Sequence, residues 1–408
     1  MSRRVVVTGV GGISPMGVGW EQTRAKLQGT ENCIRRMPWD HIEDLQTKLG
    51  APAENVTFPS HFTRKRTRGM GRNAKLATLA TEMALTEAGL LDDPLVKSGQ
   101  LGISWGSSAG STDAFAEFTN LLRNNSLEGL NATTYVRMMS HTAAVNIGVF
   151  FGITGRIVPT SSACTAGSQG IGYAYEAIRY GRQDLMVAGG SEELCPTEAA
   201  VFDVLYATST KNDSPQLTPS PFDADRDGLV IGEGACSLIL EEYEHARARG
   251  ANILCEIVGF GTNADGTHVT QPNKVTMQRA LEMALGDAGL SGIDISYVNA
   301  HGTATEHGDI AESQATRGAI GRAVPISSIK SYTGHTLGAC GALEAWCSIN
   351  MLNEGWVCPT LNLTRVDPRC GELDYVAGST RAVDGEFFMS NNFAFGGINT
   401  SLIFRKLS

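Results

Sequence analysis

The stretch IVPTSSACTAGSQG, residues 157–170, joins two kinds of local structure. Its first four residues follow Arg156 and indicate a short apolar strand, and its small residues and glycines open a helix that we expect to reach about Tyr180. Cys164 then stands at the strand-to-helix turn, where unpaired backbone N–H groups and the helix dipole stabilise negative charge. A thiol pKa near ~8.5 can fall to roughly 3.5–7.5 in such a place, so Cys164 is a candidate nucleophile; the alternative is an inert buried cysteine.

The composition bounds the class of protein. The chain has 408 residues, of which 42% are hydrophobic, and a net charge of -9. These values predict a large core, in two or three domains or one duplicated unit, and argue against general nucleic-acid binding. Nine scattered cysteines without a C-x-x-C pair indicate neither a disulfide framework nor a zinc site. We therefore expect a cytoplasmic protein with reduced thiols, and no membrane span because no apolar run is long enough.

Two segments far apart in the chain carry nearly the same ten letters. Residues 81–90 read TEMALTEAGL and residues 281–290 read LEMALGDAGL, with seven positions shared. Each follows a glycine-containing strand, and each half later has a strand that runs into a glycine-rich helix start. We predict an internally duplicated α/β fold with halves at 1–250 and 251–408, and largely parallel sheets covered by helices.

The second half supplies two histidines and a glycine-rich loop. His301 follows a strand predicted at 295–300, and His335 lies in SYTGHTLG at 331–338, the counterpart of the cysteine segment. Side chains after strand ends face the region where open α/β sheets bind ligands. Residues 388–399 form a glycine-bearing loop between two predicted strands, and its backbone N–H groups are suited to hold an oxyanion.

Three shorter motifs point to other chemistries. GVGGIS at 9–14 lacks the third glycine of a dinucleotide loop, so we interpret it as a tight turn. DADRDG at 223–228 begins like a calcium loop, but the twelfth position is Gly234, so we expect a structural turn held by carboxylate–arginine pairing. GSSAG at 106–110 matches the elbow of serine hydrolases and leaves Ser108 as an alternative nucleophile.

One segment of this acidic chain is strongly basic. Between residues 64 and 75 there is no acidic side chain, and the basic ones are Arg64, Lys65, Arg66, Arg68, Arg72 and Lys75. The segment is either a solvated helix start or a docking site for an acidic partner.

Together these motifs resemble the β-ketoacyl-acyl-carrier-protein synthases, above all the bacterial condensing enzymes I and II of the thiolase-like superfamily. The resemblance runs through the whole chain in order. It rests on SAC at 162–164, NAHGT at 299–303, KSYTGH at 330–335, NFAFGG at 392–397, and PFD, DG and GEGA between 221 and 235. It implies a pseudo-symmetric, five-layered αβαβα fold, usually in an intimate homodimer.

The resemblance also implies catalytic roles. Cys164 is the expected nucleophile, and His301 and His335 are expected to assist decarboxylation of a malonyl donor and to stabilise the enolate. The backbone N–H groups of Cys164 and Phe395 are expected to form the oxyanion hole, with Phe395 gating the second substrate. Lys330 is expected to hold the electrostatics of the site, and its usual companion is Glu344.

Substrate-binding residues follow in the same way. Thr270, Thr303 and Thr305 match positions that line a phosphopantetheine tunnel. Lys65 and Arg68 match positions that dock the acyl carrier protein, which favours the docking interpretation of the basic segment. Ala109 is expected beside the acyl pocket, where a small residue predicts room for a long or rigid chain.

The expected activity is condensation of an acyl group on Cys164 with malonyl-carrier protein, as chain elongation in fatty acid biosynthesis, without a metal or a resident cofactor. Ala394 and Ile398 differ from the residues of many relatives, so a specialised polyketide or polyene pathway is the alternative. In that pathway the chain could work together with a related ketosynthase or chain-length subunit. A thiolase would need a second catalytic cysteine in the loop at 395–397, which has none. A non-catalytic chain-length partner would usually lack Cys164.

Overall fold

The strands of the computed structural model, which describes residues 2–407, form two five-stranded arrays of one design. The order in the first is β6 (Ile157–Thr160), β5 (Leu101–Gly106), β7 (Leu185–Glu192), β9 (Gly234–Glu242) and β1 (Val5–Ser14). The order in the second is β12 (Pro325–Ser327), β11 (Ile295–Asn299), β16 (Phe387–Ala394), β17 (Ile398–Arg405) and β10 (Cys255–Ala264), with β14 (Asp374–Tyr375) beyond β12. Antiparallel pairing of β1 with β10 joins the arrays into one sheet.

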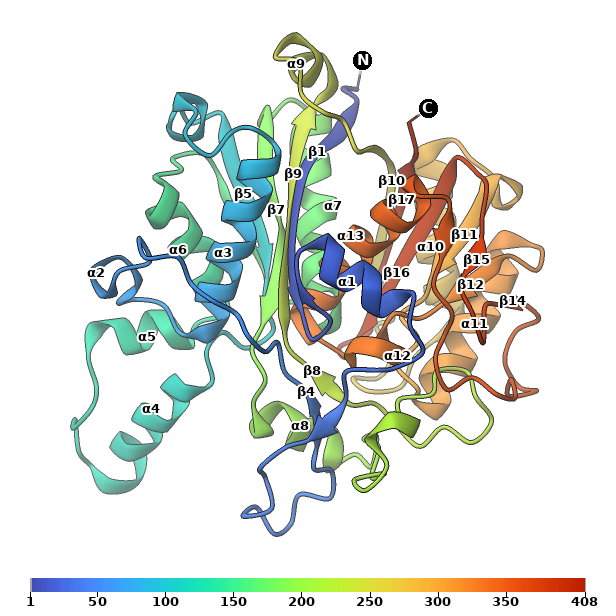
Figure 1. The fold of residues 1–408 in the computed structure, drawn as a ribbon, viewed down its shortest axis with the longest axis horizontal. Helices are drawn as coiled ribbons and strands as arrows, with labels where there is room; N and C mark the ends of the chain where they lie inside the picture. The colour runs from blue at the N-terminus through green and yellow to red at the C-terminus, as the bar shows by residue number, and fades with distance from the viewer. Residues whose placement is uncertain (1, 408) are drawn as a thin grey trace.

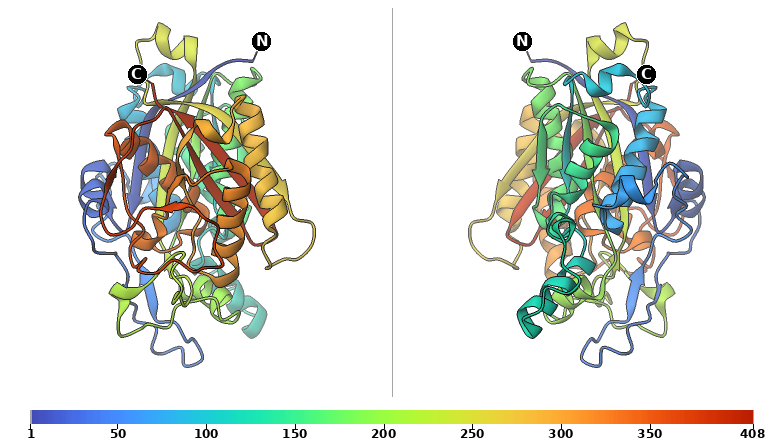
Figure 2. Two further views of the ribbon diagram at one scale, coloured as in Figure 1. Left: turned by 90° about the vertical axis from the view of Figure 1, so that its right-hand side faces the viewer. Right: turned by 90° about the vertical axis from the view of Figure 1, so that its left-hand side faces the viewer.

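Helices form three layers around these arrays (Figure 1). α7 (Ala166–Arg179) and α13 (Cys340–Asn353) lie between the arrays and contact each other and strands of both. The outer face of the first array is covered by α3 (Arg72–Glu87) and α6 (Thr142–Phe151), and that of the second by α10 (Lys274–Ala288) and α11 (Glu306–Ile320). The order αβαβα is the five-layered arrangement expected from the sequence, and its layers follow one another across Figure 1, whereas the two views of Figure 2 look onto the outer helical layers.

The repeated letters have a packing reason. A Cβ on Gly9 or Gly11 of β1 would come within 2.3 Å of a carbonyl oxygen of α3, and a Cβ on Gly259 or Gly261 of β10 would meet α10 at 2.4 and 2.1 Å. The helix residues at these contacts are Ala84 and Ala284, which match within the repeat, and Ala80 and Ala280, which match just before it. Bare strand positions and small helix residues thus let each helix lie close on its strand in both halves.

This packing corrects one expectation about the N-terminus. The segment 9–14 is not a tight turn, because β1 continues through it to Ser14. Its glycines serve helix packing: Gly9 and Gly11 admit α3, and a Cβ on Gly12 would meet the Trp346 ring at 2.2 Å.

Strand directions are largely parallel, as expected, but one strand in each array is reversed. β6, β5 and β7 pair in parallel, whereas β9 is antiparallel to both β7 and β1. The second array repeats this pattern, with β17 antiparallel to β16 and β10. The reversed strand lets each array end on a strand that runs with the others and pairs across the junction.

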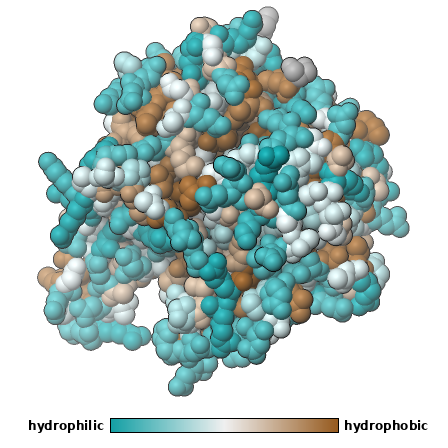
Figure 3. All heavy atoms as spheres, viewed as in Figure 1, coloured by the Kyte–Doolittle hydropathy of each residue, from teal (hydrophilic) through white to brown (hydrophobic). Residues whose placement is uncertain are grey.

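Shorter elements surround the two arrays. They are α1 (Trp20–Leu27), α2 (Arg64–Thr67), α4 (Asp113–Asn124), α5 (Ala132–Met138), α8 (Pro196–Asp203), α9 (Tyr243–Ala248) and α12 (Lys330–Thr333). The expected boundary at residue 250 falls between α9 and β10 and stays a prediction. Within residues 2–407, no helix has both the length and the apolar character that a membrane crossing requires. The face in Figure 3 is mainly hydrophilic, with apolar side chains scattered among the polar ones.

Candidate active site

Cys164 lies at a strained corner between β6 and α7. The residue before it, Ala163, has a φ of 49°, a left-handed conformation that costs a side-chain-bearing residue free energy. Ala163 begins a short 3₁₀ turn, Ala163–Thr165, which leads directly into α7. The strain turns the chain so that Cys164 stands at the start of the helix, with 4% of its surface exposed.

The second half builds the same corner at Leu337, whose φ is 45° and which opens α13 through the turn Leu337–Ala339. The sequence suggested His335 as the residue at this turn. The matching backbone instead makes Gly338 the structural equivalent of Cys164. His335 lies three residues earlier, in the loop that follows α12.

His335 faces the sulfur from that loop. Its Nε2 lies 2.9 Å from Sγ of Cys164, and its Nδ1 accepts a hydrogen bond from the backbone N–H of Leu337 at 3.3 Å. A nitrogen that accepts carries no proton, so the neutral ring bears its proton on Nε2. His335 therefore directs an N–H donor at the position of the nucleophile.

His301 lies beside His335, with ring centroids 5.1 Å apart and ring planes at 89°. Its Nδ1 is 3.2 Å from Nζ of Lys330 and 3.4 Å from Nδ2 of Asn392, both of which are donors. The same reasoning puts the proton of His301 on Nε2. Two Nε2–H groups thus converge near one sulfur.

Lys330 and Glu344 form a buried ion pair behind His301. Asn392 completes the group by donating from Nδ2 to Glu344 at 2.7 Å. Burial opposes the charge of Lys330, but Cys340 and Glu344 outweigh it and raise the pKa of the lysine above its ordinary value. A fixed positive charge therefore stands next to both histidines.

Burial, reinforced by Lys330, lowers the pKa of His301 and of His335 well below 6.5, so both rings are neutral at neutral pH. Burial raises the pKa of Cys164 to about 12, although Lys330 and the backbone N–H groups of Phe395 and Cys164 act in the opposite direction. The expected acidification of the thiol is wrong for the free protein, because the loss of water outweighs the donors around the sulfur.

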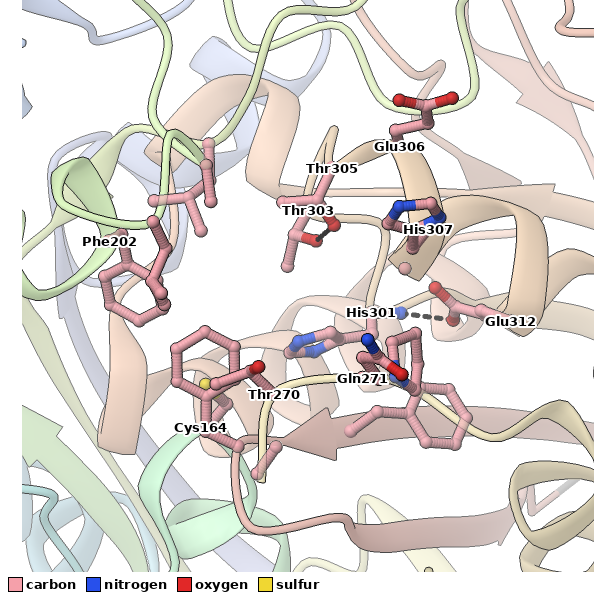
Figure 4. A pocket seen from close by; sticks show the side chains of 18 of the residues that line it. Cys164, Phe202, Thr270, Gln271, His301, Thr303, Thr305, Glu306, His307 and Glu312 are labelled. Atoms are coloured by element: carbon pink, nitrogen blue, oxygen red, sulfur yellow. Dashed lines mark hydrogen bonds between the residues drawn. The ribbon is translucent and has the colours of Figure 1, made fainter. Parts of the chain in front are cut away.

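A cavity of about 550 Å³ reaches this sulfur from the surface (Figure 4). The predicted residues that line it are Cys164, His301, His335, Phe395, Thr270, Thr303 and Thr305. Lys330 and Glu344 lie behind His301 rather than on the wall. The structure thus brings the expected catalytic and tunnel residues to one site, with Lys330 and Glu344 behind its wall.

Three predicted residues lie elsewhere. Ala109 does not line the cavity; it sits in the loop after β5, where its N–H donates to Glu192 at 3.4 Å. Lys65 and Arg68 are exposed in and just after α2, and neither forms a salt bridge within residues 2–407. Their neighbours Arg66 and Arg72 serve the fold, the first over the Phe150 ring at 3.6 Å and the second on Glu233.

The structure explains the calcium-like and serine motifs. Arg226, from the calcium-like loop, is buried, pairs with Asp367 at 2.8 Å and donates to the backbone oxygen of Thr305 at 3.2 Å. The loop is therefore a turn held by carboxylate–arginine pairing, as expected, and it also holds the threonine wall of the cavity. None of the histidine hydrogen bonds found in residues 2–407 reaches Ser108, so the hydrolase alternative lacks its base.

Two buried carboxylates of the site escaped the sequence analysis. Glu312 on α11 accepts from the backbone N–H groups of His301 at 2.6 Å and Gly302 at 2.7 Å, and burial raises its pKa to about 8. Glu192 at the end of β7 accepts from Ser108 N at 2.6 Å and Gly338 N at 3.1 Å. In the sequence each is only an acidic residue in an otherwise apolar segment, and this pattern does not identify the backbone N–H groups that the carboxylate binds.

The nucleophile and the histidines also form a donor set that could hold a metal. The ligand atoms of Cys164, His301 and His335 lie within 4.8 Å of one another and are buried. One sulfur and two imidazoles suit Zn²⁺, with a fourth position left open to the cavity. The protons inferred on both Nε2 atoms oppose this use, because a metal needs the lone pair of each nitrogen.

A duplicated five-layered α/β fold with a cysteine at one strand-to-helix corner and two histidines over its sulfur defines a thiolase-like condensing enzyme. The family follows from the comparisons. Residues 2–246 match the model of the beta-ketoacyl synthase N-terminal domain, and residues 254–364 match that of the C-terminal domain. The chain belongs to the beta-ketoacyl synthase family.

Relatives cover the whole chain. It is 37% identical over 415 residues to 3-oxoacyl-[acyl-carrier-protein] synthase 2 of Vibrio harveyi, covering 100% of this chain and 99% of that protein. A crystal structure of a beta-ketoacyl synthase from Burkholderia phymatum STM815 matches with a TM-score of 0.98 and 56% identity over both full chains. The structure of the ishigamide ketosynthase/chain length factor matches with a TM-score of 0.90 and 30% identity over both full chains. The structure of a type II polyketide acyl-carrier protein in complex with its ketosynthase matches with a TM-score of 0.87 and 31% identity, also over both full chains.

Proposed function

We propose that this chain is a 3-oxoacyl-[acyl-carrier-protein] synthase that elongates acyl chains in fatty acid biosynthesis. The observation that carries the proposal is the convergence of two Nε2–H donors on a sulfur at the end of a cavity, with Nε2 of His335 2.9 Å from Sγ. The match to elongating synthases over the whole chain supports it.

In the first half-reaction, Sγ of Cys164 attacks the thioester carbonyl of an acyl-carrier protein. The oxyanion that forms is held by the backbone N–H groups of Cys164 and Phe395, which already point at the sulfur in the free protein. The bond to the pantetheine sulfur breaks, and that sulfur leaves with the thiol proton. The acyl group remains as a thioester on Cys164, which divides one difficult reaction into two easier ones.

In the second half-reaction, a malonyl thioester loses carbon dioxide. The electron pair of the broken C–C bond moves into the thioester and makes an enolate, whose oxygen accepts from Nε2–H of His301 and His335. The enolate carbon attacks the acyl group on Cys164, and the new oxyanion accepts hydrogen bonds from the N–H groups of Cys164 and Phe395. The Cys164 sulfur then leaves as a thiolate, which takes a proton from water. Neutral imidazoles suit this role, because they donate without an acidic proton to lose at neutral pH.

The residues behind the histidines position them. Lys330 and Asn392 hold Nδ1 of His301 as an acceptor, and Glu344 holds Lys330 and Asn392 together. Glu312 fixes the backbone of His301 from the other side. These contacts keep both Nε2–H groups aimed at one point, and preorganised donors of this kind stabilise a developing charge most effectively.

The substrates arrive on a carrier protein, with pantetheine in the cavity along Thr270, Thr303 and Thr305. The exposed cations Lys65 and Arg68 form the docking site for the acidic carrier. The chemistry requires no metal and no resident cofactor, since the phosphopantetheine belongs to the substrate. We propose a cytoplasmic homodimer.

A specialised polyketide pathway is the second candidate. It is supported by the likeness to a ketosynthase solved with a type II polyketide carrier protein and to one solved with a chain length factor. In that case this chain would be the catalytic member of a pair with a related subunit, since it retains Cys164.

Intact-protein mass spectrometry tests the proposal. The chain is incubated with a series of acyl-carrier proteins and then with malonyl-carrier protein. We expect a mass gain of one acyl group, and then its loss with release of carbon dioxide and of a carrier thioester two carbons longer. Acylation by saturated primers without a second subunit supports fatty acid elongation; acylation only beside a partner subunit supports the polyketide candidate; no acylation under either condition contradicts both.

A further inference from the structure

Glu198 is a buried carboxyl group without a partner. It lies in α8, 6% of its surface is exposed, and neither Oε1 nor Oε2 forms a hydrogen bond within residues 2–407. Burying a polar group without a hydrogen bond costs free energy, and nearly all buried polar groups in native proteins are paired. The partner of Glu198 therefore comes from outside this part of the chain.

The helix that carries Glu198 packs beside the nucleophile. Glu198 lies one helical turn before Phe202, so both occupy one face of α8. Ala199 and Phe202 belong to the same buried apolar cluster as Cys164, and the Phe202 ring lies 5.0 Å from that of Phe395 and 6.4 Å from that of His335. Glu198 does not line the cavity of Figure 4, so it does not face the pantetheine route.

The ionisable groups whose charges act on Glu198 form no hydrogen bond with it within residues 2–407. They are Glu192, Glu193, Cys195 and Glu233, all acidic or weakly polar. Each neighbouring carboxylate is occupied: Glu192 by Ser108 N at 2.6 Å, Glu193 by Thr112 N at 2.7 Å, and Glu233 by Ala53 N at 2.9 Å. Two of these donors belong to the loop after β5, which also carries Ala109. Within residues 2–407 these neighbouring carboxylates thus have hydrogen-bond donors, whereas Glu198 has none.

We propose that Glu198 lines the pocket for the acyl chain on Cys164 and determines specificity by binding an oxygen-bearing group, a hydroxyl or a carbonyl, on that chain. The proposal rests on the proposed function, because it takes Cys164 as the acylated residue.

The protonation of Glu198 sets the chemistry of the ligand. Burial, and then the charges of Glu192 and Glu193, raise its pKa well above the ordinary value, which favours the neutral acid. A neutral carboxyl donates through its O–H and accepts through its C=O, which matches a hydroxyl or a ketone. A plain hydrocarbon chain would leave both oxygens unpaired, so discrimination of about tenfold or more is expected.

The test is a competition between matched primers. Hexanoyl-carrier protein competes with hydroxyhexanoyl-carrier proteins that bear the hydroxyl at different carbons, and intact mass reports which group Cys164 takes. We expect the wild type to prefer one hydroxylated isomer by about tenfold. Glu198→Leu, of similar volume, is expected to abolish the preference while still accepting hexanoyl, whereas Glu198→Gln, which keeps a donor and an acceptor, retains part of it.

Several results would overturn the proposal. They are equal acylation by all isomers in the wild type, an unchanged preference in Glu198→Leu, or a preference for an aminohexanoyl chain, which would require an ionised Glu198. Thermal unfolding adds an independent readout: Glu198→Leu is expected to raise Tm by removing an unpartnered carboxyl, and a lower Tm would assign Glu198 to the fold or to a second copy of the chain. Failure of the wild type to accept hexanoyl or any isomer would instead contradict the proposed function.

Discussion

The two strand-to-helix corners of this molecule share a backbone and differ in chemistry. Ala163 and Leu337 adopt nearly the same left-handed conformation, with φ of 49° and 45°, and each opens a helix of 14 residues. The first corner places a reactive side chain, Cys164, after the strained residue. The second places Gly338 there and carries its reactive residue, His335, in the preceding loop.

The difference follows from how the corners meet. A Cβ on Gly338 would approach Oε2 of Glu192 at 2.7 Å, and a Cβ on Gly167 would approach the carbonyl oxygen of Gly338 at the same distance. The second corner has to be bare because Glu192 and the loop after β5 lie against Gly338, and Gly167 has to be bare because the second corner lies against the start of α7. The two halves therefore have matching strand-to-helix corners, and close packing leaves room for a side chain after the strained residue at only the first of them.

The largest effect is expected from removing the side chain that distinguishes the first corner. Cys164→Ala should abolish acylation and lower condensation by about 10³-fold or more, because no other group can carry the acyl chain. Carbon dioxide release from malonyl-carrier protein should persist, since the histidines remain. Cys347→Ala, at a buried cysteine on α13 away from the sulfur, is the matched control and should still be acylated; equal losses in both variants would contradict the assignment.

Removing the histidines of the second half should slow the half-reaction in which the malonyl thioester loses carbon dioxide. His301→Asn and His335→Asn should each lower malonyl decarboxylation by about 10²–10³-fold, as expected for loss of a donor to a developing oxyanion. Only His335→Asn should also change the rate at which iodoacetamide alkylates Cys164, because only His335 contacts Sγ. Equal alkylation rates in the wild type and both variants would show that His335 does not act on the nucleophile.

A smaller effect is expected from the charge behind the histidines. The pair Lys330→Met with Glu344→Gln removes a positive charge that lowers the pKa of His301 and His335, without leaving a lone buried carboxylate. Both histidine pKa values should rise, so the acid limb of kcat/KM against pH should move to higher pH, with activity lower by about tenfold. An acid limb that stays in place or moves to lower pH would contradict this coupling.

The smallest effects on activity are expected at the strained residues, whose substitution should change stability instead. Ala163→Gly relieves the left-handed conformation while losing only a methyl group, so urea unfolding should show a change within about 1 kcal/mol, towards higher stability. Leu337→Gly relieves the same strain but removes a side chain that is 5% exposed, and should cost about 2–4 kcal/mol. Similar changes in both variants would mean that the corners differ less than their packing indicates.

The sequence by itself determined the duplication and the reacting groups. The shared letters at 81–90 and 281–290 reported a helix that packs on strand glycines in each half, a local pattern fixed by the need for small residues at close contacts. The strand ends before Cys164 and His301 were readable because apolar runs and glycine-rich helix starts have short-range signatures.

Only the tertiary structure decided how these groups act. The pKa of Cys164 depends on burial by segments from both halves, so the helix start seen in the sequence gave the wrong direction. The protons on Nε2 follow from Leu337 N, Lys330 and Asn392, contacts that no spacing encodes. The isolation of Glu198 likewise appears only once its acidic neighbours have found other donors. Such properties come from summed desolvation and pairing across the chain, which are non-local.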